Sequence, residues 1–154
     1  KGARHCERDN RTIACRGFPF YPYLTRQKEF VGVGTYWVFE DRCWMMSNLE
    51  LVDRKFVEEF IATYEALFVK DKDEFDTYVT FSATARRTFS RWKREIPLLG
   101  RKGELLIVTP STGEIRRGKS RDYPKMEPFN SEKNYKQAIK DAGGVYPKDG
   151  LRPA

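Results

Sequence analysis

The side chains best suited to metal or thiol chemistry lie in the N-terminal part of the chain. His5, Cys6, Cys15 and Cys43 could formally supply four zinc ligands. Zinc sites usually take their cysteines from Cys-x2-Cys pairs, and no such pair occurs here. We therefore expect no metal site. An odd number of cysteines favours a reducing compartment over a secreted disulfide framework, with a Cys6–Cys15 bridge left open.

A phosphate-loop pattern occurs at residues 113–120. The sequence GEIRRGKS satisfies Gly-x4-Gly-Lys-Ser and follows a strand-like hydrophobic run. In a nucleotide site this loop leads directly into a helix whose first amides meet the phosphates. Pro124 and Pro128 prevent such a helix, and too few residues remain for the rest of a nucleotide-binding sheet. We expect the match to be accidental and expect no cofactor.

Acid–base catalysis would need a different set of side chains. His5 is the only histidine, so a Ser-His or Cys-His pair would have to recruit it from the N-terminal segment. Glu58, Glu59 and Glu65 lie largely off the apolar face of a predicted helix, where solvated carboxylates are usual. We therefore expect no catalytic residues and no small-molecule ligand, and we expect that the protein is not an enzyme.

Basic side chains remain, and the chemistry open to them is phosphate binding. Arginine forks match phosphate oxygens and lysine ammonium groups neutralise them. The candidate nucleic-acid-binding residues are Arg4, Arg8, Arg11, Arg16, Arg86, Arg87, Arg91, Lys93, Arg94, Arg116, Arg117, Lys119 and Arg121. The sequence has no RNP1, KH or zinc-finger signature, so we expect contact with the RNA backbone rather than base reading.

The distribution of charge supports this interpretation. The 154 residues include 29 Lys and Arg against 22 Asp and Glu, a net charge of +7. The segments 1–28, 82–100 and 101–154 are basic, whereas 29–81 is acidic. Basic flanks suit a polyanionic partner, either nucleic acid or an acidic protein surface; a solvated surface that binds nothing is the alternative. With a mean hydropathy of −0.69 and no apolar run of about 18 residues, we expect no membrane span.

Hydrophobic periodicity predicts the sheet and the first helix. Strands are expected near residues 31–39, 43–47, 104–109 and 113–117. The first helix should follow a capping box formed by Ser47 and Glu50. Its inward face, at helical spacing, should contain Phe56, Phe60, Tyr64 and Leu67 or Phe68.

A second helix is predicted from about Ser82 to Ile96, ended by Pro97. Its inner stripe should contain Ala85, Phe89, Trp92 and Ile96. The candidate basic residues of this segment should then lie outside the stripe, on a phosphate-facing or merely solvated surface. A short third helix should span Ser131 to Ala142, with Ser131 as N-cap and two glycines after its end.

These elements divide the chain into three parts. Residues 1–28 should form an extended basic and aromatic arm whose aromatic rings lie on the domain or on a partner. Residues 29–118 should form a compact α+β domain, and 119–154 an extended C-terminal arm with one short helix. The chain begins at Lys1 rather than Met. We expect a processed or truncated chain, and removal of a targeting peptide is one of the two explanations.

The expected fold is α+β: a small antiparallel sheet packed by two amphipathic helices, with extended basic N- and C-terminal arms. This architecture is similar to that of proteins in large assemblies such as ribosomes, including mitochondrial ones. We therefore expect a non-catalytic structural component of a large ribonucleoprotein, with a mitochondrial ribosomal protein that contacts ribosomal RNA and neighbouring protein subunits as the first choice. The alternative is an accessory subunit of a mitochondrial respiratory-chain or ATP-synthase complex, with a small enzyme third. The expected location is mitochondrial, or otherwise another reducing intracellular compartment.

Overall fold

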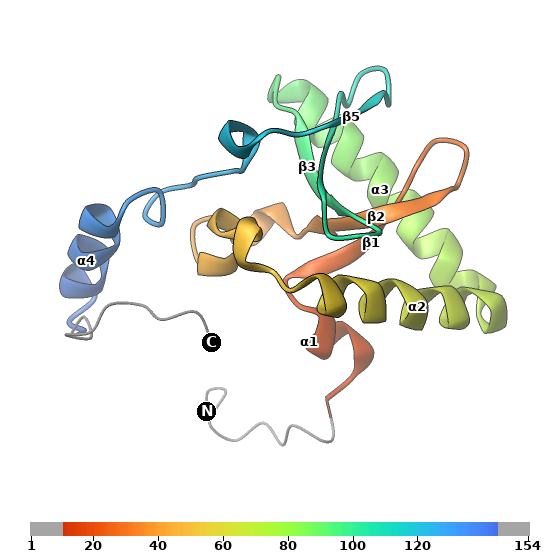
Figure 1. Ribbon diagram of the computed structural model, residues 1–154, viewed down its shortest axis with the longest axis horizontal. Coiled ribbons are helices and arrows are strands. Elements are labelled where there is room, and N and C mark those ends of the chain that lie inside the picture. The colour runs from red at the N-terminus through yellow and green to blue at the C-terminus, as the bar shows by residue number, and fades with distance from the viewer. Residues whose placement is uncertain (1–10, 145–154) are drawn as a thin grey trace.

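The computed structural model describes residues 11–144, and in this range the chain forms a five-stranded antiparallel sheet packed by helices (Figure 1). The strands are β1 (Phe20–Leu24), β2 (Phe30–Thr35), β3 (Ile96–Gly100), β4 (Leu105–Val108) and β5 (Ile115–Arg117). Their order in the sheet is their order in the chain, so β1 and β5 are the edges. The fold is α+β, as the sequence predicts.

Helices precede, interrupt and follow the sheet. They are α1 (Ile13–Gly17), α2 (Arg54–Lys70), α3 (Lys72–Arg91) and α4 (Glu132–Asp141). The two long helices, α2 and α3, lie between β2 and β3 in the chain and diverge as a V from Asp71 (Figure 1). The Asp71 side chain accepts a hydrogen bond from the Glu74 amide at 3.0 Å, which caps the start of α3.

The apolar face predicted for the first helix is confirmed. Phe60 and Tyr64 of α2 are buried, and the other predicted positions pack against the same core. Phe20 of β1 lies on this face, with its ring centroid 5.6 Å from that of Phe56. Each large side chain fully removed from water contributes about 1.5 to 3 kcal/mol, so the buried side chains of this face stabilise the packing of α2 on the core.

The strand predicted at 43–47 is wrong. The strand predicted at 31–39 ends at Thr35, and the chain continues through short 3-10 helices at Trp37–Phe39, Trp44–Ser47 and Leu49–Leu51. Several aromatic residues in this stretch gave it a strand-like composition. The rings of Tyr36 and Trp37 instead pack between β1 and α3: the Trp37 ring centroid lies 5.1 Å from that of Phe81.

The capping box is also wrong. Ser47 is fully buried, and its hydroxyl accepts a hydrogen bond from the Met126 amide at 2.8 Å. Helix α2 begins at Arg54, where the Asp53 carboxylate accepts from the Lys55 amide at 2.7 Å. The serine therefore fixes a segment close in space but distant in sequence, whereas a capping box is a purely local pattern.

The strand β1 lies within the segment predicted as an arm. Tyr21, Tyr23 and Leu24 are at most 1% exposed, and β1 pairs with β2 along its whole length. The expectation that aromatic rings of this segment lie on the domain is thus confirmed for the rings of β1. The boundary drawn at residue 28 falls inside the turn that joins β1 to β2.

Helix α3 begins ten residues earlier than predicted and ends before Trp92. Ala85 and Phe89 are buried as expected, but Trp92 is 48% exposed and Ile96 belongs to β3. The helix stops because Lys93 adopts a positive φ of 54°, which turns the chain toward β3. Trp92 therefore leaves the inner stripe, and the sequence-based expectation that its ring is buried is wrong.

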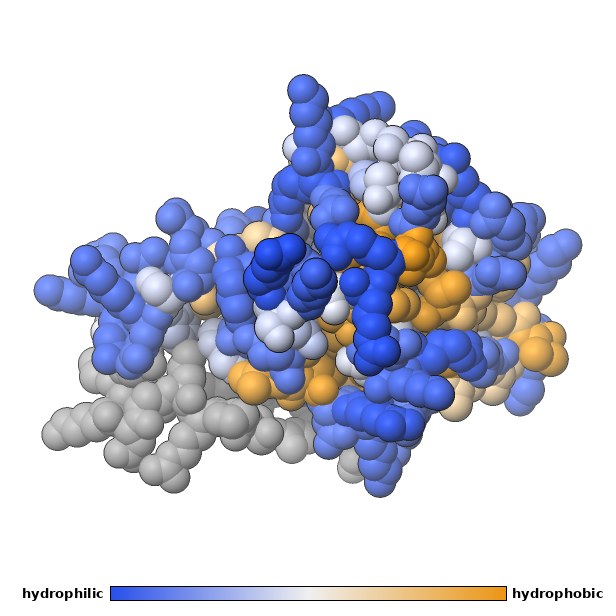
Figure 2. All heavy atoms as spheres, turned by 45° about the horizontal axis from the view of Figure 1, so that its top comes forward, coloured by the Kyte–Doolittle hydropathy of each residue, from blue (hydrophilic) through white to orange (hydrophobic). Residues whose placement is uncertain are grey.

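The short C-terminal helix is confirmed within one residue at each end. Ser131 caps α4 by accepting a hydrogen bond from the Asn134 amide at 3.2 Å. Helix α4 stands away from the sheet and has no buried residue (Figure 1). Figure 2 shows that hydrophilic side chains cover this extension at the left of the view.

Buried tyrosines make the stability of this fold sensitive to alkaline pH. Burial raises the pKa of Tyr21, Tyr36 and Tyr78 above the ordinary value of 10.0, because a phenolate loses its hydration in the core. Above this value the unfolded chain ionises these phenols while the folded chain keeps them neutral. Their contribution to stability is complete below about pH 10 and is lost as the pH rises above it.

We therefore expect a constant melting temperature between about pH 7 and 9 and a falling one above about pH 10, measured by circular dichroism. The absorbance of phenolate should rise together with unfolding. Phenolate absorbance that rises fully while the protein stays folded would contradict the burial of Tyr21 and Tyr78 and the partial burial of Tyr36.

Candidate nucleic-acid interface

Arg86 is buried, with 7% of its surface exposed, and it holds the free edge of β1. Its Nη1 donates to the Leu24 carbonyl oxygen at 2.9 Å and to the Tyr23 hydroxyl at 3.0 Å. Ser82, one turn earlier in α3, accepts from the Leu24 amide at 3.0 Å. An edge strand has backbone groups without partners in the sheet, and here α3 supplies them from its side chains.

The expectation that Arg86 lies on a free surface is therefore wrong. A single inner stripe was assumed for α3, but the helix packs both on the core and along the edge of β1. Its residues on the edge-facing side are buried as well, and they include an arginine. The guanidinium also lies 5.6 Å from the ring centroid of Tyr23.

Arg94 and Arg116 are occupied by internal ion pairs. Arg94 forms two hydrogen bonds to the Glu40 carboxylate, at 3.1 and 2.9 Å, and lies over the rings of Phe89 and Trp92. Arg116 joins two carboxylates, those of Glu95 and Asp122, at 2.9 Å each. These two arginines fix local structure, and the sequence offered no sign of their partners.

Asp122 organises the segment that resembles a phosphate loop. Its carboxylate accepts from the Lys119 amide at 2.8 Å and from Arg116, and both contacts lower the pKa of Asp122. Residues 113–120 run through a turn and β5 into a 3-10 helix of three residues, Ser120–Asp122. An α-helix does not follow the pattern in this described stretch, so the chain lacks the geometry of a phosphate loop there.

The remaining candidates are dispersed. Arg117, Lys119 and Arg121 are exposed at or after β5, and Lys93 is exposed beyond the end of α3. Arg117 lines a cavity of about 920 Å³ together with Glu29 and Glu104, so the charges there are mixed.

Two of the N-terminal candidates lie near α1, and the other two are outside the described residues. The Arg16 Nε donates to the Arg11 carbonyl oxygen at 3.1 Å. Arg16 also lines a largely apolar groove of about 290 Å³ against α2. Arg4 and Arg8 fall in the undescribed segment, as do His5 and Cys6.

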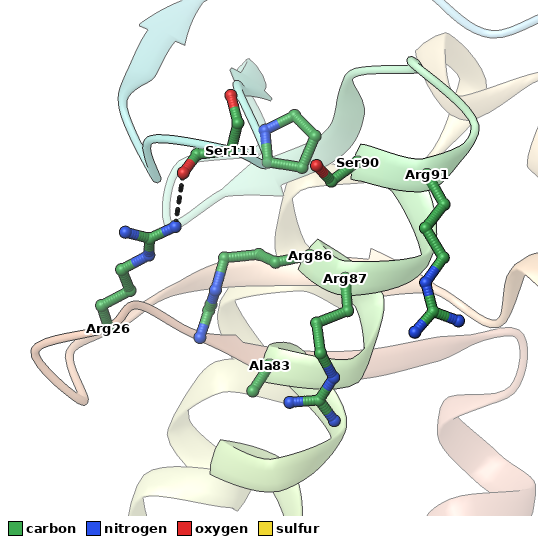
Figure 3. A pocket seen from close by; sticks show the side chains of 8 residues that line it. Arg26, Ala83, Arg86, Arg87, Ser90, Arg91 and Ser111 are labelled. Carbon is green, nitrogen blue, oxygen red and sulfur yellow. Dashed lines mark hydrogen bonds between the residues drawn. The ribbon is translucent and has the colours of Figure 1, made fainter.

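One pocket gathers basic residues from three parts of the chain. It has a volume of about 460 Å³ and lies between the β1–β2 turn, the C-terminal half of α3 and the β4–β5 turn (Figure 3). Its lining consists of Arg26, Ala83, Arg86, Arg87, Ser90, Arg91, Pro110 and Ser111, and we call it the arginine pocket. Of the sequence-predicted residues, it brings together Arg86, Arg87 and Arg91.

Arg26 lines the pocket but was not among the residues predicted from the sequence. This residue lies in the β1–β2 turn, and its Nη2 donates to the Ser111 carbonyl oxygen at 2.6 Å across the pocket (Figure 3). A correct hairpin prediction would have placed Arg26 in a turn but not beside α3. Its place depends on how the sheet folds back toward the helix, which local patterns do not specify.

The charge in the arginine pocket is not balanced by the described part of the chain. None of the described lining residues is acidic. Arg26, Arg86, Arg87 and Arg91 form no ion pair within residues 11–144. The Arg87 Nη2 has only a neutral partner, the Thr84 hydroxyl at 2.9 Å. Guanidinium groups that line one pocket without a carboxylate can bind an anion, and phosphate oxygens match the donor geometry of a guanidinium.

Comparison with known proteins gives no indication of function, so the function is argued from the geometry of the arginine pocket. No family model, no curated protein and no solved structure matches the chain. Across the described residues, no helix combines the length and the apolar character that a membrane crossing requires.

Proposed function

We propose that this protein is a non-catalytic structural component of a large ribonucleoprotein and that its arginine pocket binds phosphate groups of RNA. The observation that carries this proposal is that Arg26, Arg86, Arg87 and Arg91 line one pocket and that its lining contains no carboxylate. RNA presents a phosphate at every nucleotide, and arginine is the side chain best matched to it.

The chemistry of the pocket lining supports binding rather than catalysis. The potential nucleophiles in the lining are the hydroxyls of Ser90 and Ser111. A hydroxyl needs a base to take its proton, and arginine stays protonated at neutral pH. The described lining can hold and neutralise a phosphate but offers no group that would activate an attacking atom.

The C-terminal extension supports membership of an assembly. Helix α4 has 10 residues and buries none of them. A helix of this length is marginal in water on its own, and packing against a neighbouring subunit would add to the stability that its contacts within the chain provide. In this proposal protein subunits pack against α4 while RNA occupies the arginine pocket. The mitochondrial ribosome remains the assembly that we expect from the sequence.

The test is whether the purified full chain carries RNA. After purification at low salt, we expect a raised ratio of nucleic-acid to protein absorbance that falls on ribonuclease treatment or at high salt, because phosphate contacts release counterions. Fractionation with and without detergent serves as the control for a lipid partner. Protein free of RNA and retained with membranes until detergent is added would contradict the proposal.

A further inference from the structure

The arginine pocket has a floor and a rim with different properties. Arg86 forms the floor, and its guanidinium lies between the side chains of Arg26 and Arg87 (Figure 3). Arg26, Arg87 and Arg91 are exposed residues around it. An anion that reaches Arg86 must therefore project into the pocket between the rim arginines.

Arg86 lacks a counter-ion among the described residues. It contacts the Leu24 carbonyl oxygen, the Tyr23 hydroxyl and the Tyr23 ring, all of them uncharged. A charge that is more than nine-tenths buried is costly unless an opposite charge lies nearby. Since the lining contains no carboxylate, a bound anion is the group that would balance this charge.

Internal and terminal phosphates of RNA differ in how they fit such a pocket. An internal phosphodiester has one negative charge and two free oxygens, and a ribose on each side keeps it at the surface of the strand. A terminal phosphomonoester has three free oxygens and close to two negative charges at neutral pH. It also projects from the end of the strand, so it can descend to a recessed guanidinium.

We propose that the arginine pocket binds the terminal phosphate of an RNA strand, a phosphomonoester, rather than an internal phosphodiester. This inference rests on the proposed function, because it takes RNA as the source of the phosphate. Arg86 contacts the phosphate from below, and Arg26 and Arg87 clamp it from the rim. The protein thus recognises a strand end, and single-stranded RNA with a phosphorylated end is its ligand class.

The experiment compares oligoribonucleotides of one sequence that carry a 5′-phosphate, a 3′-phosphate or hydroxyl groups at both ends. Equilibrium binding to the full chain is followed by fluorescence anisotropy. We expect at least one phosphorylated form to bind about tenfold or more tightly than the hydroxyl form, as an added charge-assisted contact implies. Inorganic phosphate should compete with that form and reduce the difference.

Arg87→Ala is the decisive variant, because Arg87 is exposed and its loss leaves the β1 edge intact. We expect it to reduce the preference for the phosphorylated end to about twofold or less. Arg117→Ala, an exposed arginine outside the pocket, is the matched control and should keep the full preference. Arg86→Lys retains a charge at the floor but not the fork, and circular dichroism shows whether this variant is folded.

Three results would overturn the inference in different ways. If all three oligonucleotides bind with equal affinity, and Arg87→Ala weakens the binding of each to the same extent, the pocket binds internal phosphates. The proposed function would then stand. Absence of binding to any of the three by folded protein would reject the proposed function together with the inference. A preference for the phosphorylated end that survives Arg87→Ala would place end recognition outside the pocket and overturn the assignment.

Discussion

Arg86→Ala is expected to lower the free energy of unfolding by about 2 to 4 kcal/mol. The change removes two hydrogen bonds that Nη1 donates to β1 and leaves the buried Leu24 carbonyl without its side-chain partner. It also removes a side chain that covers the Tyr23 ring and leaves unfilled space beside the edge strand. The loss of a buried charge without a counter-ion offsets part of this cost.

The control is Arg87→Ala at the adjacent position. Arg87 is exposed and donates a local hydrogen bond to the Thr84 hydroxyl, so we expect a change of about 0.5 kcal/mol or less. Urea denaturation of both variants, with equal m-values, gives the comparison. Equal stability of the two variants would show that α3 does not hold the edge of β1 through Arg86.

The double substitution Arg87→Glu with Arg91→Glu is expected to weaken RNA binding about a hundredfold or more at low salt. Each reversal removes a charge-assisted contact worth about 1.5 kcal/mol or more and places a carboxylate beside the phosphate. Both side chains are exposed, so we expect the free energy of unfolding to stay within about 1 kcal/mol of the original value.

A matched control separates a local contact from the effect of net charge. Lys70→Glu with Lys72→Glu changes the net charge by the same amount at exposed positions around the junction of α2 and α3. We expect this variant to lose about fivefold or less in RNA affinity at about 0.1 M salt, where exposed charges are screened beyond about 10 Å. Similar losses in the two double variants would mean that RNA responds to overall charge and not to the arginine pocket.

Parts of the fold that local patterns determine could be predicted from the sequence. The spacing of Phe56, Phe60 and Tyr64 predicted the buried face of α2, and the Ser131 cap predicted α4. The apolar run at 104–109 predicted β4. In each case the residues that decide the structure are neighbours in the sequence, so propensity and periodicity contain the necessary information.

Features that depend on long-range contacts could not be predicted in this way. The segment 20–24 alternates aromatic residues with proline, which excludes a helix but does not reveal a strand until β2 pairs with it. The start of α3 is rich in charge, and its apolar residues Phe75, Tyr78 and Phe81 pack only because α2 and the 3-10 segments lie opposite. Ser47 looked like a cap because its partner at residue 126 is distant in the chain.

The sequence predicted the type of site, a cluster of basic residues, but not which residues form it. The clustering of arginine in 82–96 identified α3 as a phosphate-binding candidate, and the structure retains Arg87 and Arg91 as exposed members of the pocket. Arg94 and Arg116 could not be excluded as phosphate-binding candidates from the sequence, because the carboxylates that they pair with lie elsewhere in the chain. Arg86 is buried and Arg87 is exposed because β1 runs past α3 on the side of Arg86. The residues of β1 were predicted to belong to an arm, so this difference could not be predicted.

The salt dependence of RNA affinity tests the central claim most directly, because its slope counts phosphate contacts. The measurement compares the original protein with the variant Arg87→Glu and Arg91→Glu over a series of salt concentrations. If both arginines contact phosphates, the plot of log affinity against log salt concentration flattens by roughly 1.4 to 1.8 in the variant. An unchanged slope and affinity would contradict RNA binding at the arginine pocket and would favour a protein or lipid partner for the basic surface.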